Sequence, residues 1–436
     1  MPDAPPADAI YFLSLELENV RCFGEKQVLD LRDPKDPSRP AMWTVILGEN
    51  GTGKTTLLQM LAMWAVNKGP PKAGAFIPGL LAQHTDNIGR RGADLTARVV
   101  ARTFGRFDNR YTETGWFGIT QSNTEATHTS PGGDLRTLQR VHGYGASRTH
   151  APHTRDMERA WAEVATLFRP DATLMSPEEW LLRLDYRAAD AGRKGAAQAA
   201  LDRLKAMLVE LLPDVTAVYL SPPEARGLAA SAGKVTFDTP YGRVALRDLS
   251  LGYQTLIAWT VDLAFRLAVA SPDAENPLET PCVVLVDEID LHLHPAWQRT
   301  LHRQLRAWFP NAQFIVTAHS PLVVQSALDE NLAVLRREGD HVVIDNDPQV
   351  VQGWRVDQLL TSDLFGLKGS RSEQVEQTLE RRRELVAKED LTPDEAEELK
   401  RLDAEADALP TASGADQAAM DLIRQAAALL KARSAP

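Results

Sequence analysis

The sequence is poor in cysteine and contains no long apolar run. Only two cysteines occur, Cys22 and Cys282, and their separation excludes both a disulfide framework and a Cys-x-x-Cys zinc site. Both lie in apolar stretches typical of strands, so we expect two buried thiols. No segment approaches the roughly 20 consecutive apolar residues that span a bilayer. The start of the chain lacks the basic segment and apolar core of a secretory signal, so we expect a cytoplasmic protein with no membrane partner.

The sequence also lacks an excess of positive charge. Lys and Arg number 48 against 59 Asp and Glu, a net charge of −11, which argues against broad adhesion to nucleic-acid phosphates. A local basic face would still allow binding, so nucleic acid stays open as a partner. The length of 436 residues, at roughly 150 residues per domain, is ample for a large buried core.

Apolar patterns predict an α/β head over residues 1–330. Strands are expected within 10–48, and the last of them runs into a glycine-rich loop followed by a helix over 55–67. Continuous apolar runs at 282–286 and 314–316 are typical of buried parallel strands. Strands and helices in this alternation indicate an α/β fold around a parallel sheet. Further helices are expected over 249–270 and 295–308.

Two stretches interrupt and extend this head. Residues 69–246 are an insertion, in which alternating segments within 75–150 predict an antiparallel lobe with a small sheet of its own, and 155–213 predict helices. A hairpin and connector are expected over 331–370. A charged helical extension is expected over 371–436, and it is too poor in aromatic residues to form a second core.

The strongest motif is a phosphate-binding loop. Residues 48–55 fit G-x-x-x-x-G-K-[ST] between an apolar strand and a helix, which is the context that the motif requires. Glycines let backbone N–H groups turn toward phosphate oxygens, Lys54 reaches the terminal phosphates and Thr55 ligates magnesium. We therefore predict an ATP and Mg²⁺ site on Gly48, Asn50, Gly51, Thr52, Gly53, Lys54, Thr55 and Thr56.

A carboxylate pair follows the apolar run at 282–286. A phosphate loop needs a second group to hold magnesium at the end of a neighbouring buried strand, and Asp287 is placed for that role beside Thr55. The adjacent Glu288 is predicted to polarise the attacking water, because an acid at the strand tip points toward the terminal phosphate. An ordinary acidic loop after a strand is the alternative explanation of the pair.

Residues 249–254, Leu-Ser-Leu-Gly-Tyr-Gln, open the apolar helix. They resemble the signature motif of ABC-type P-loop ATPases of the SMC- and OLD-related AAA branch. A Ser hydroxyl and a Gly backbone at a helix start can hold an anion, although Ser-x-Gly is also a common helix cap. The resemblance implies that Ser250 and Gly252 contact the terminal phosphate bound by an opposite subunit, and therefore a homodimer or higher oligomer of heads closed around ATP.

The segments around Asp290–Pro295 and His319 extend this resemblance. They are similar to the D-loop and the switch-histidine strand of anti-phage defence ATPases of the Septu PtuA and retron-associated kind. The resemblance implies that His319 contacts the terminal phosphate. His292 and His294 have no partners at zinc-binding spacing, so structural packing is expected of them.

Two N-terminal segments complete the match. Residues 19–23 resemble the N-terminal strand of this family, which places Arg21 near the nucleotide base, and residues 143–148 resemble its tyrosine-glycine segment. Gln139 is the nearest candidate for a Q-loop residue.

Three functions fit such a head. The resemblance favours the regulatory ATPase of a prokaryotic anti-phage system that controls a separate nuclease effector. A RecF- or SMC-like repair or chromosome-maintenance ATPase is the second, although the Pro- and Gly-broken region between Lys54 and Ser250 does not predict coiled-coil arms. The third is an OLD-type nuclease with an acidic cluster at 338–347, but a hairpin turn at 337–340 accounts for that segment more simply. An apolar stripe at 418–430 predicts a helix that either folds back or docks a partner.

Overall fold

The structure is a computed structural model of the whole chain. It describes residues 9–66, 95–104, 112–119, 124–129, 140–149, 163–221, 233–327, 330–348, 354–362, 365, 371–388 and 391–409. Two compact units divide it, Met1–Leu359 and Leu360–Pro436. Gln139 and the apolar stripe at 418–430 lie outside the described residues.

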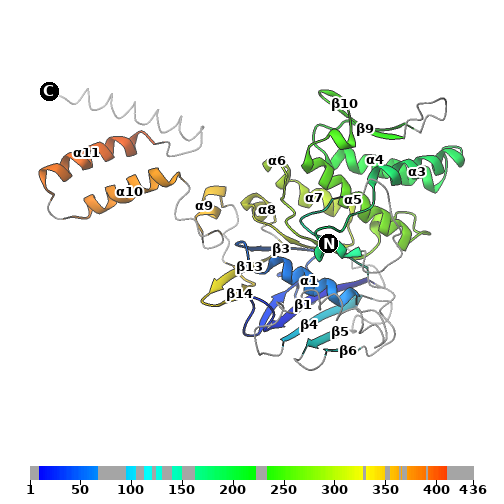
Figure 1. The fold of residues 1–436 in the computed structure, drawn as a ribbon, viewed down its shortest axis with the longest axis horizontal. Coiled ribbons are helices and arrows are strands. Elements are labelled where there is room, and N and C mark those ends of the chain that lie inside the picture. The colour runs from blue at the N-terminus through cyan, green and yellow to red at the C-terminus, as the bar shows by residue number, and fades with distance from the viewer. Residues whose placement is uncertain are drawn as a thin grey trace. The chain divides into compact units, whose positions relative to one another are not determined.

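The first unit combines strands and helices (Figure 1). Its strands are β1 (Ala9–Glu18), β2 (Gln27–Asp30), β3 (Trp43–Gly48), β4 (Leu95–Phe104), β5 (Thr112–Ile119), β6 (Thr124–Thr129), β7 (Val141–Tyr144), β8 (Ala217–Ser221), β9 (Lys234–Thr239), β10 (Gly242–Ala245), β11 (Cys282–Val286), β12 (Ala312–Thr317), β13 (Asn331–Glu338) and β14 (His341–Asp345). Its helices are α1 (Lys54–Val66), α3 (Pro177–Asp190), α4 (Ala196–Leu211), α5 (Leu251–Ala270), α6 (Pro295–Gln298), α7 (Leu301–Trp308), α8 (Pro321–Ser326) and, at the boundary, α9 (Val356–Leu360).

The central sheet has the order β14-β13-β3-β12-β11-β7. Neighbours from β13 to β7 are all parallel, and only the terminal pair β13 and β14 is antiparallel. Every residue of β11 and β12 is buried, which confirms the buried parallel strands that their continuous apolar runs predict. Because the strands are parallel, the loops after β3, β7, β11 and β12 all emerge at one edge of the sheet.

A second, antiparallel sheet has the order β2-β1-β4-β5-β6. The expectation that the inserted strands form a sheet of their own is wrong, because β4 pairs along β1 from Ala9↔Phe104 to Glu18↔Thr96. The physical reason is that β1 has two edges. Strand β2 pairs with one of them, so without β4 the other edge of this 10-residue strand would have no partner strand.

Helix α1 packs against strands of both sheets and against the short helical turn at 165–167. Its described side chains are buried on all sides, including Leu57, Leu58, Met60 and Leu61, as a helix that is apolar around its circumference requires. The two sheets are also joined by the buried amide of Gln313, whose oxygen accepts from the Phe12 N–H at 2.8 Å and whose nitrogen donates to the Phe12 carbonyl at 2.8 Å. This core holds the start of α1, and with it the phosphate loop, in place.

A third sheet, β10-β9-β8, lies with α3, α4 and α5 at one end of the first unit, while β1, β4, β5 and β6 lie at the other end (Figure 1). Helices α3 and α4 confirm the helices predicted within 155–213. The single helix predicted over 295–308 is instead two, α6 and α7. It breaks after Gln298, whose side-chain amide donates to the carbonyls of Asp290 and Leu293 and so holds the end of α6 against the preceding loop.

The hairpin predicted at 337–340 is present as the turn between β13 and β14, where Glu338 pairs with His341. It was expected to follow the head, but β13 pairs in parallel with β3, so the hairpin extends the sheet of the head itself. The compact unit accordingly continues to Leu359. The acidic residues of the hairpin do not form a metal site, because the described ranges hold no group of three His, Cys, Asp or Glu side chains that could bind a metal.

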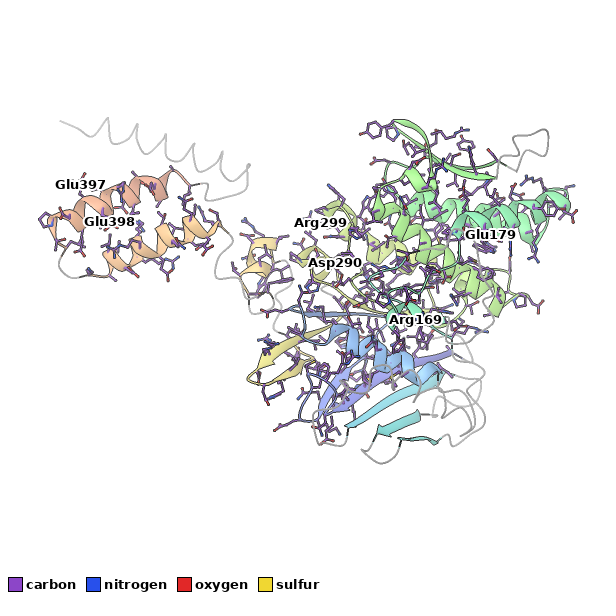
Figure 2. All side chains as sticks on the ribbon, in the orientation of Figure 1. Arg169, Glu179, Asp290, Arg299, Glu397 and Glu398 are labelled. Atoms are coloured by element: carbon purple, nitrogen blue, oxygen red, sulfur yellow. The ribbon has the colours of Figure 1, made fainter. Side chains whose placement is uncertain are left out.

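The second unit contains α10 (Glu373–Val386) and α11 (Pro393–Asp407). Thr392 caps α11 in a reciprocal bond with Glu395, as its Thr-Pro-Asp-Glu sequence predicts. Ion pairs such as Arg381 with Glu398, at 3.0 Å, run between the two helices, and Glu398 is labelled in Figure 2. Leu385 and Leu402 are the buried leucines of this pair.

Candidate nucleotide site

The loop between β3 and α1 is folded around the Lys54 side chain. Its ammonium donates to the carbonyls of Gly48 at 2.7 Å and Glu49 at 2.9 Å, and the Thr52 hydroxyl donates to the Glu49 carbonyl at 2.8 Å. Gly53 has a φ of +92°, and a Cβ there would lie 2.5 Å from the sulfur of Cys22. Only glycine fits that position, so the backbone can curl in the way that a phosphate cradle requires.

The predicted magnesium pair is brought together across 232 residues of sequence. The Thr55 hydroxyl donates to Asp287 Oδ2 at 2.7 Å, and the Thr317 hydroxyl donates to Asp287 Oδ1 at 2.6 Å. Asp287 is 4% exposed, so the carboxylate is held from two sides at the ends of β11 and β12. A hydroxyl and a carboxylate in this position are the ligands that Mg²⁺ accepts in proteins.

One cavity of about 280 Å³ collects the sequence-distant groups. It is lined by Arg21, Cys22, Asn50, Gly51, Gly53, Lys54, Thr55, Thr56, Glu288 and His319. All of these except Cys22 are predicted site residues. The expectation of a buried strand thiol is wrong for Cys22, which is half-buried in a turn after β1 and donates to the Thr52 carbonyl at 3.4 Å. The other thiol, Cys282, is buried in β11 as expected.

Arg21 reaches the cavity from that same turn and not from a strand, which corrects the interpretation of residues 19–23. Strand β1 ends at Glu18, and Arg21 has a φ of 50°. Its guanidinium donates to Thr56 Oγ1 at 3.1 Å and to Gln59 Oε1 at 2.9 Å. Burial lowers its pKa. The bonds to α1 fix the guanidinium beside the phosphate loop.

Charges of both signs meet at Lys54. Burial lowers the pKa of its ammonium, and the carboxylates of Asp287, Glu288 and Asp290 oppose that change. A buried ammonium next to several carboxylates suits a ligand that brings both a cation and anionic oxygens, because each sign of charge then finds a partner. Residues of this type and arrangement fit Mg²⁺ with a nucleoside triphosphate.

The loops after β11 and β12 are tied to each other at the edge of the cavity. The His319 backbone N–H donates to Asp290 Oδ2 at 2.9 Å, and the His319 side chain is exposed (Asp290 is labelled in Figure 2). His292 and His294 are both exposed, so the packing expected of them is wrong; His294 instead caps α6, because its Nδ1 accepts from the Ala296 N–H at 3.2 Å. Neither His292 nor His294 lines the cavity.

The signature residues lie elsewhere on the head. Ser250 is the N-cap of α5, its side chain is exposed, and it makes no capping hydrogen bond. Gly252 is buried against the loop after β11, where a Cβ would lie 2.3 Å from the His292 carbonyl oxygen. Neither residue lines the cavity around Lys54, so within one subunit the structure does not bring them into the nucleotide site.

Arg148 is a buried residue to which sequence reasoning assigned no role. Its guanidinium donates to the carbonyls of Asp287 and Glu288, each at 2.8 Å. It follows β7, whose carboxyl end lies next to that of β11. The signal in the sequence was the glycine-containing segment at 141–145 followed by one cation. Only the pairing of β7 with β11 shows where that cation lies.

The family of the chain is shown by the comparison with known proteins. The family model described as "AAA domain, putative AbiEii toxin, Type IV TA system" matches residues 43–325. The chain belongs to this AAA-domain family. The match begins in β3 and ends in α8, so it contains the phosphate loop, the carboxylate pair and His319.

Relatives of this AAA protein confirm the resemblance to defence ATPases. The Septu protein PtuA of Bacillus mycoides is 27% identical over 360 residues, which are 80% of this chain and 45% of that protein. The retron Vc95 probable ATPase of Vibrio cholerae is 47% identical over 92 residues, which are 21% of this chain and 18% of that protein. The chain thus spans less than half the length of these curated relatives.

A solved SMC head bound to the C-terminal winged-helix domain of ScpA matches 77% of this AAA chain and 97% of its own, with a TM-score of 0.44 and 14% identity. In the part of the chain that the structure describes, no helix is long and apolar enough to cross a membrane.

Proposed function

We propose that this chain binds Mg²⁺–ATP in the cavity around Lys54 and hydrolyses it. The observation that carries the proposal is the convergence of the phosphate loop, Asp287 and Glu288 at one edge of the parallel sheet, with Thr55 and Asp287 2.7 Å apart. Phosphoryl transfer to water requires a phosphate-binding loop, a hydroxyl–carboxylate pair for magnesium such as Thr55 and Asp287, and a second carboxylate such as Glu288.

The roles follow from the geometry. Lys54 neutralises the terminal phosphates, and Thr55 and Asp287 hold the magnesium, which supplies charge neutralisation between the phosphates. Glu288 lines the same cavity and orients the attacking water as a general base. His319 and Arg21 supply two further donors at the rim of the cavity, toward the terminal phosphate and the nucleoside respectively.

The test is a pair of substitutions with a matched control. Lys54→Ala removes a buried charge that contacts the phosphates, so we expect loss of ATP binding. Glu288→Gln keeps the shape of the side chain and removes the base, so we expect ATP binding with hydrolysis about 100-fold slower or more. Glu338→Gln, in the exposed turn of the β13–β14 hairpin, should hydrolyse ATP as the wild type does. Turnover of Glu288→Gln within threefold of wild type would remove Glu288 from this role.

We further infer that the ATPase is the regulatory subunit of an anti-phage defence system and controls a separate nuclease effector. The names of its relatives, Septu PtuA and retron ATPases, support this assignment. So does the hairpin at 337–340, since it uses the acidic segment that an intrinsic nuclease would have needed.

The experiment is co-expression with the product of the neighbouring open reading frame. We expect the two to co-purify and the nuclease activity of the complex to differ between wild type and Glu288→Gln. ATP hydrolysis that DNA stimulates in the absence of any such partner would favour the repair or chromosome-maintenance alternative instead.

A further inference from the structure

Glu288 has an unusual backbone conformation for a residue with a side chain. Its φ is +47°, in the left-handed region. That conformation is unfavourable for a residue with a side chain and persists only where surrounding contacts enforce it. The conformation therefore needs an explanation in the groups that hold the Glu288 backbone.

Both polar groups of the Glu288 backbone are held. Its N–H donates to the Thr317 hydroxyl at 2.7 Å, and its carbonyl accepts from Arg148 Nη2 at 2.8 Å. Arg148 Nη1 donates at 2.8 Å to the carbonyl of Asp287, one residue earlier. One planar guanidinium thus bridges two consecutive carbonyls across the point where β11 ends.

The Arg148 side chain is placed by strand pairing. Strand β7 runs parallel to β11, with Tyr144 opposite Val286, and the Asp287 N–H donates to the Tyr144 carbonyl at 2.8 Å. The chain then turns, with the Arg148 N–H bonded to the Gly145 carbonyl at 3.3 Å, and the side chain returns to the end of β11. The next strand in the sheet therefore controls the geometry of the catalytic loop.

Arg148 is 3% exposed, so its charge must be compensated. Burial lowers its pKa to about 10, and the carboxylates of Asp287, Glu288 and Asp290 oppose that change. The guanidinium thus stays charged at neutral pH, and its bonds to carbonyl oxygens are charge-assisted and directional. Lysine could contact one carbonyl but could not reproduce the planar two-donor fork.

We propose that Arg148 is a positioning residue for hydrolysis, which holds Glu288 in its left-handed conformation so that the carboxylate faces the nucleotide cavity. This inference rests on the proposed function. Arg148 does not line the cavity, so it acts on ATP through the backbone of Asp287 and Glu288. The Asp287 carboxylate is also held by Thr55 and Thr317, so we expect the larger effect on Glu288. Loss of Arg148 should therefore change kcat and leave nucleotide binding alone.

The test is Arg148→Lys, with Arg148→Gln as a second variant, measured for kcat, KM for ATP and the Kd of a fluorescent ATP analogue. We expect kcat to fall about 10- to 100-fold, as for a misplaced catalytic group, with KM and Kd within threefold of wild type. Arg266→Lys is the matched control, because Arg266 is also a buried arginine and pairs with the side-chain carboxylate of Asp262. It should lower the melting temperature and leave kcat within threefold.

A double substitution separates positioning from general stability. If Arg148 acts mainly through Glu288, then Arg148→Lys should have little further effect on kcat in the Glu288→Gln background. Multiplicative losses would overturn the proposal, as would unchanged kcat in folded Arg148→Lys or failure of both Arg148 variants to fold. If kcat falls in Glu288→Gln but is unchanged in Arg148→Lys, the proposed function stands and only the role of Arg148 is refuted.

Discussion

The position of Ser250 gives a quantitative prediction about assembly. Its hydroxyl is exposed at the start of α5, makes no capping bond and is absent from the cavity around Lys54. Gly252 packs against the His292 carbonyl, so α5 begins on the same loop that leads from Glu288. If a second head supplies Ser250 to the terminal phosphate, two composite sites form per dimer, and each contains one such hydroxyl.

The cost of removing the hydroxyl follows from that count. A hydrogen bond to a charged group contributes about 1.5–3 kcal/mol, so Ser250→Ala should weaken the ATP-bound dimer by about 3–6 kcal/mol over two sites. That corresponds to roughly a 10²- to 10⁴-fold increase in the dimer dissociation constant. Ser250→Arg should abolish the dimer, because its long side chain occupies the space of the phosphate of the opposite subunit.

Analytical ultracentrifugation of the Glu288→Gln variant, with and without ATP and Mg²⁺, measures these effects. A mixture of Lys54→Ala and Ser250→Arg subunits contains one intact and one doubly damaged site, so some ATP-dependent dimer should return although neither variant forms it alone. If ATP leaves the size of monomeric Glu288→Gln unchanged, the composite-site reasoning is refuted. An affinity loss confined to Ser250→Arg, with none in Ser250→Ala, would show that the hydroxyl makes no phosphate contact.

Two further predictions concern the buried charges and the extension. Asp262 is 0% exposed and bonds to Arg266 at 2.5 Å, so Asp262→Ala should lower the free energy of unfolding by about 3–5 kcal/mol, whereas the double variant Asp262→Leu/Arg266→Met should lose much less. Chemical denaturation measures the free energy of unfolding of both variants. Equal losses in the two would contradict the explanation that Asp262→Ala leaves the buried charge of Arg266 uncompensated. Truncation after Pro410 should leave an intact ATPase, because the head is a compact unit that ends at Leu359, and should prevent co-purification with the partner protein. A truncated protein whose head no longer folds would mean that residues 418–430 pack on their own chain.

The parts of the site that sequence predicted are those built from contiguous residues. The loop around Lys54 joins the end of β3 to the start of α1 through a tight glycine turn, and the pair Asp287 and Glu288 directly follows the end of β11. Pairing the two motifs needed only the rule that parallel buried strands end at a common edge. The hydrogen bond from the Thr55 hydroxyl to Asp287 Oδ2 is the contact that this rule predicts.

The parts that sequence did not predict depend on which strands become neighbours. The strand β4 completes the edge of β1, and the strand β13 extends the central sheet beside β3; neither pairing is encoded in the periodicity of a single segment. Arg148 shows the consequence for function. In the sequence, Arg148 is one cation that follows a glycine turn. Its position beside Glu288 becomes clear only from the pairing of β7 with β11. The same strand carries Tyr144, whose hydroxyl donates to Asp262 of α5 at 3.1 Å. The pairing of β7 with β11 therefore connects α5, which Ser250 caps, with the carboxylates at the end of β11. Local motifs do not encode this connection, because it depends on which strands are neighbours in the sheet.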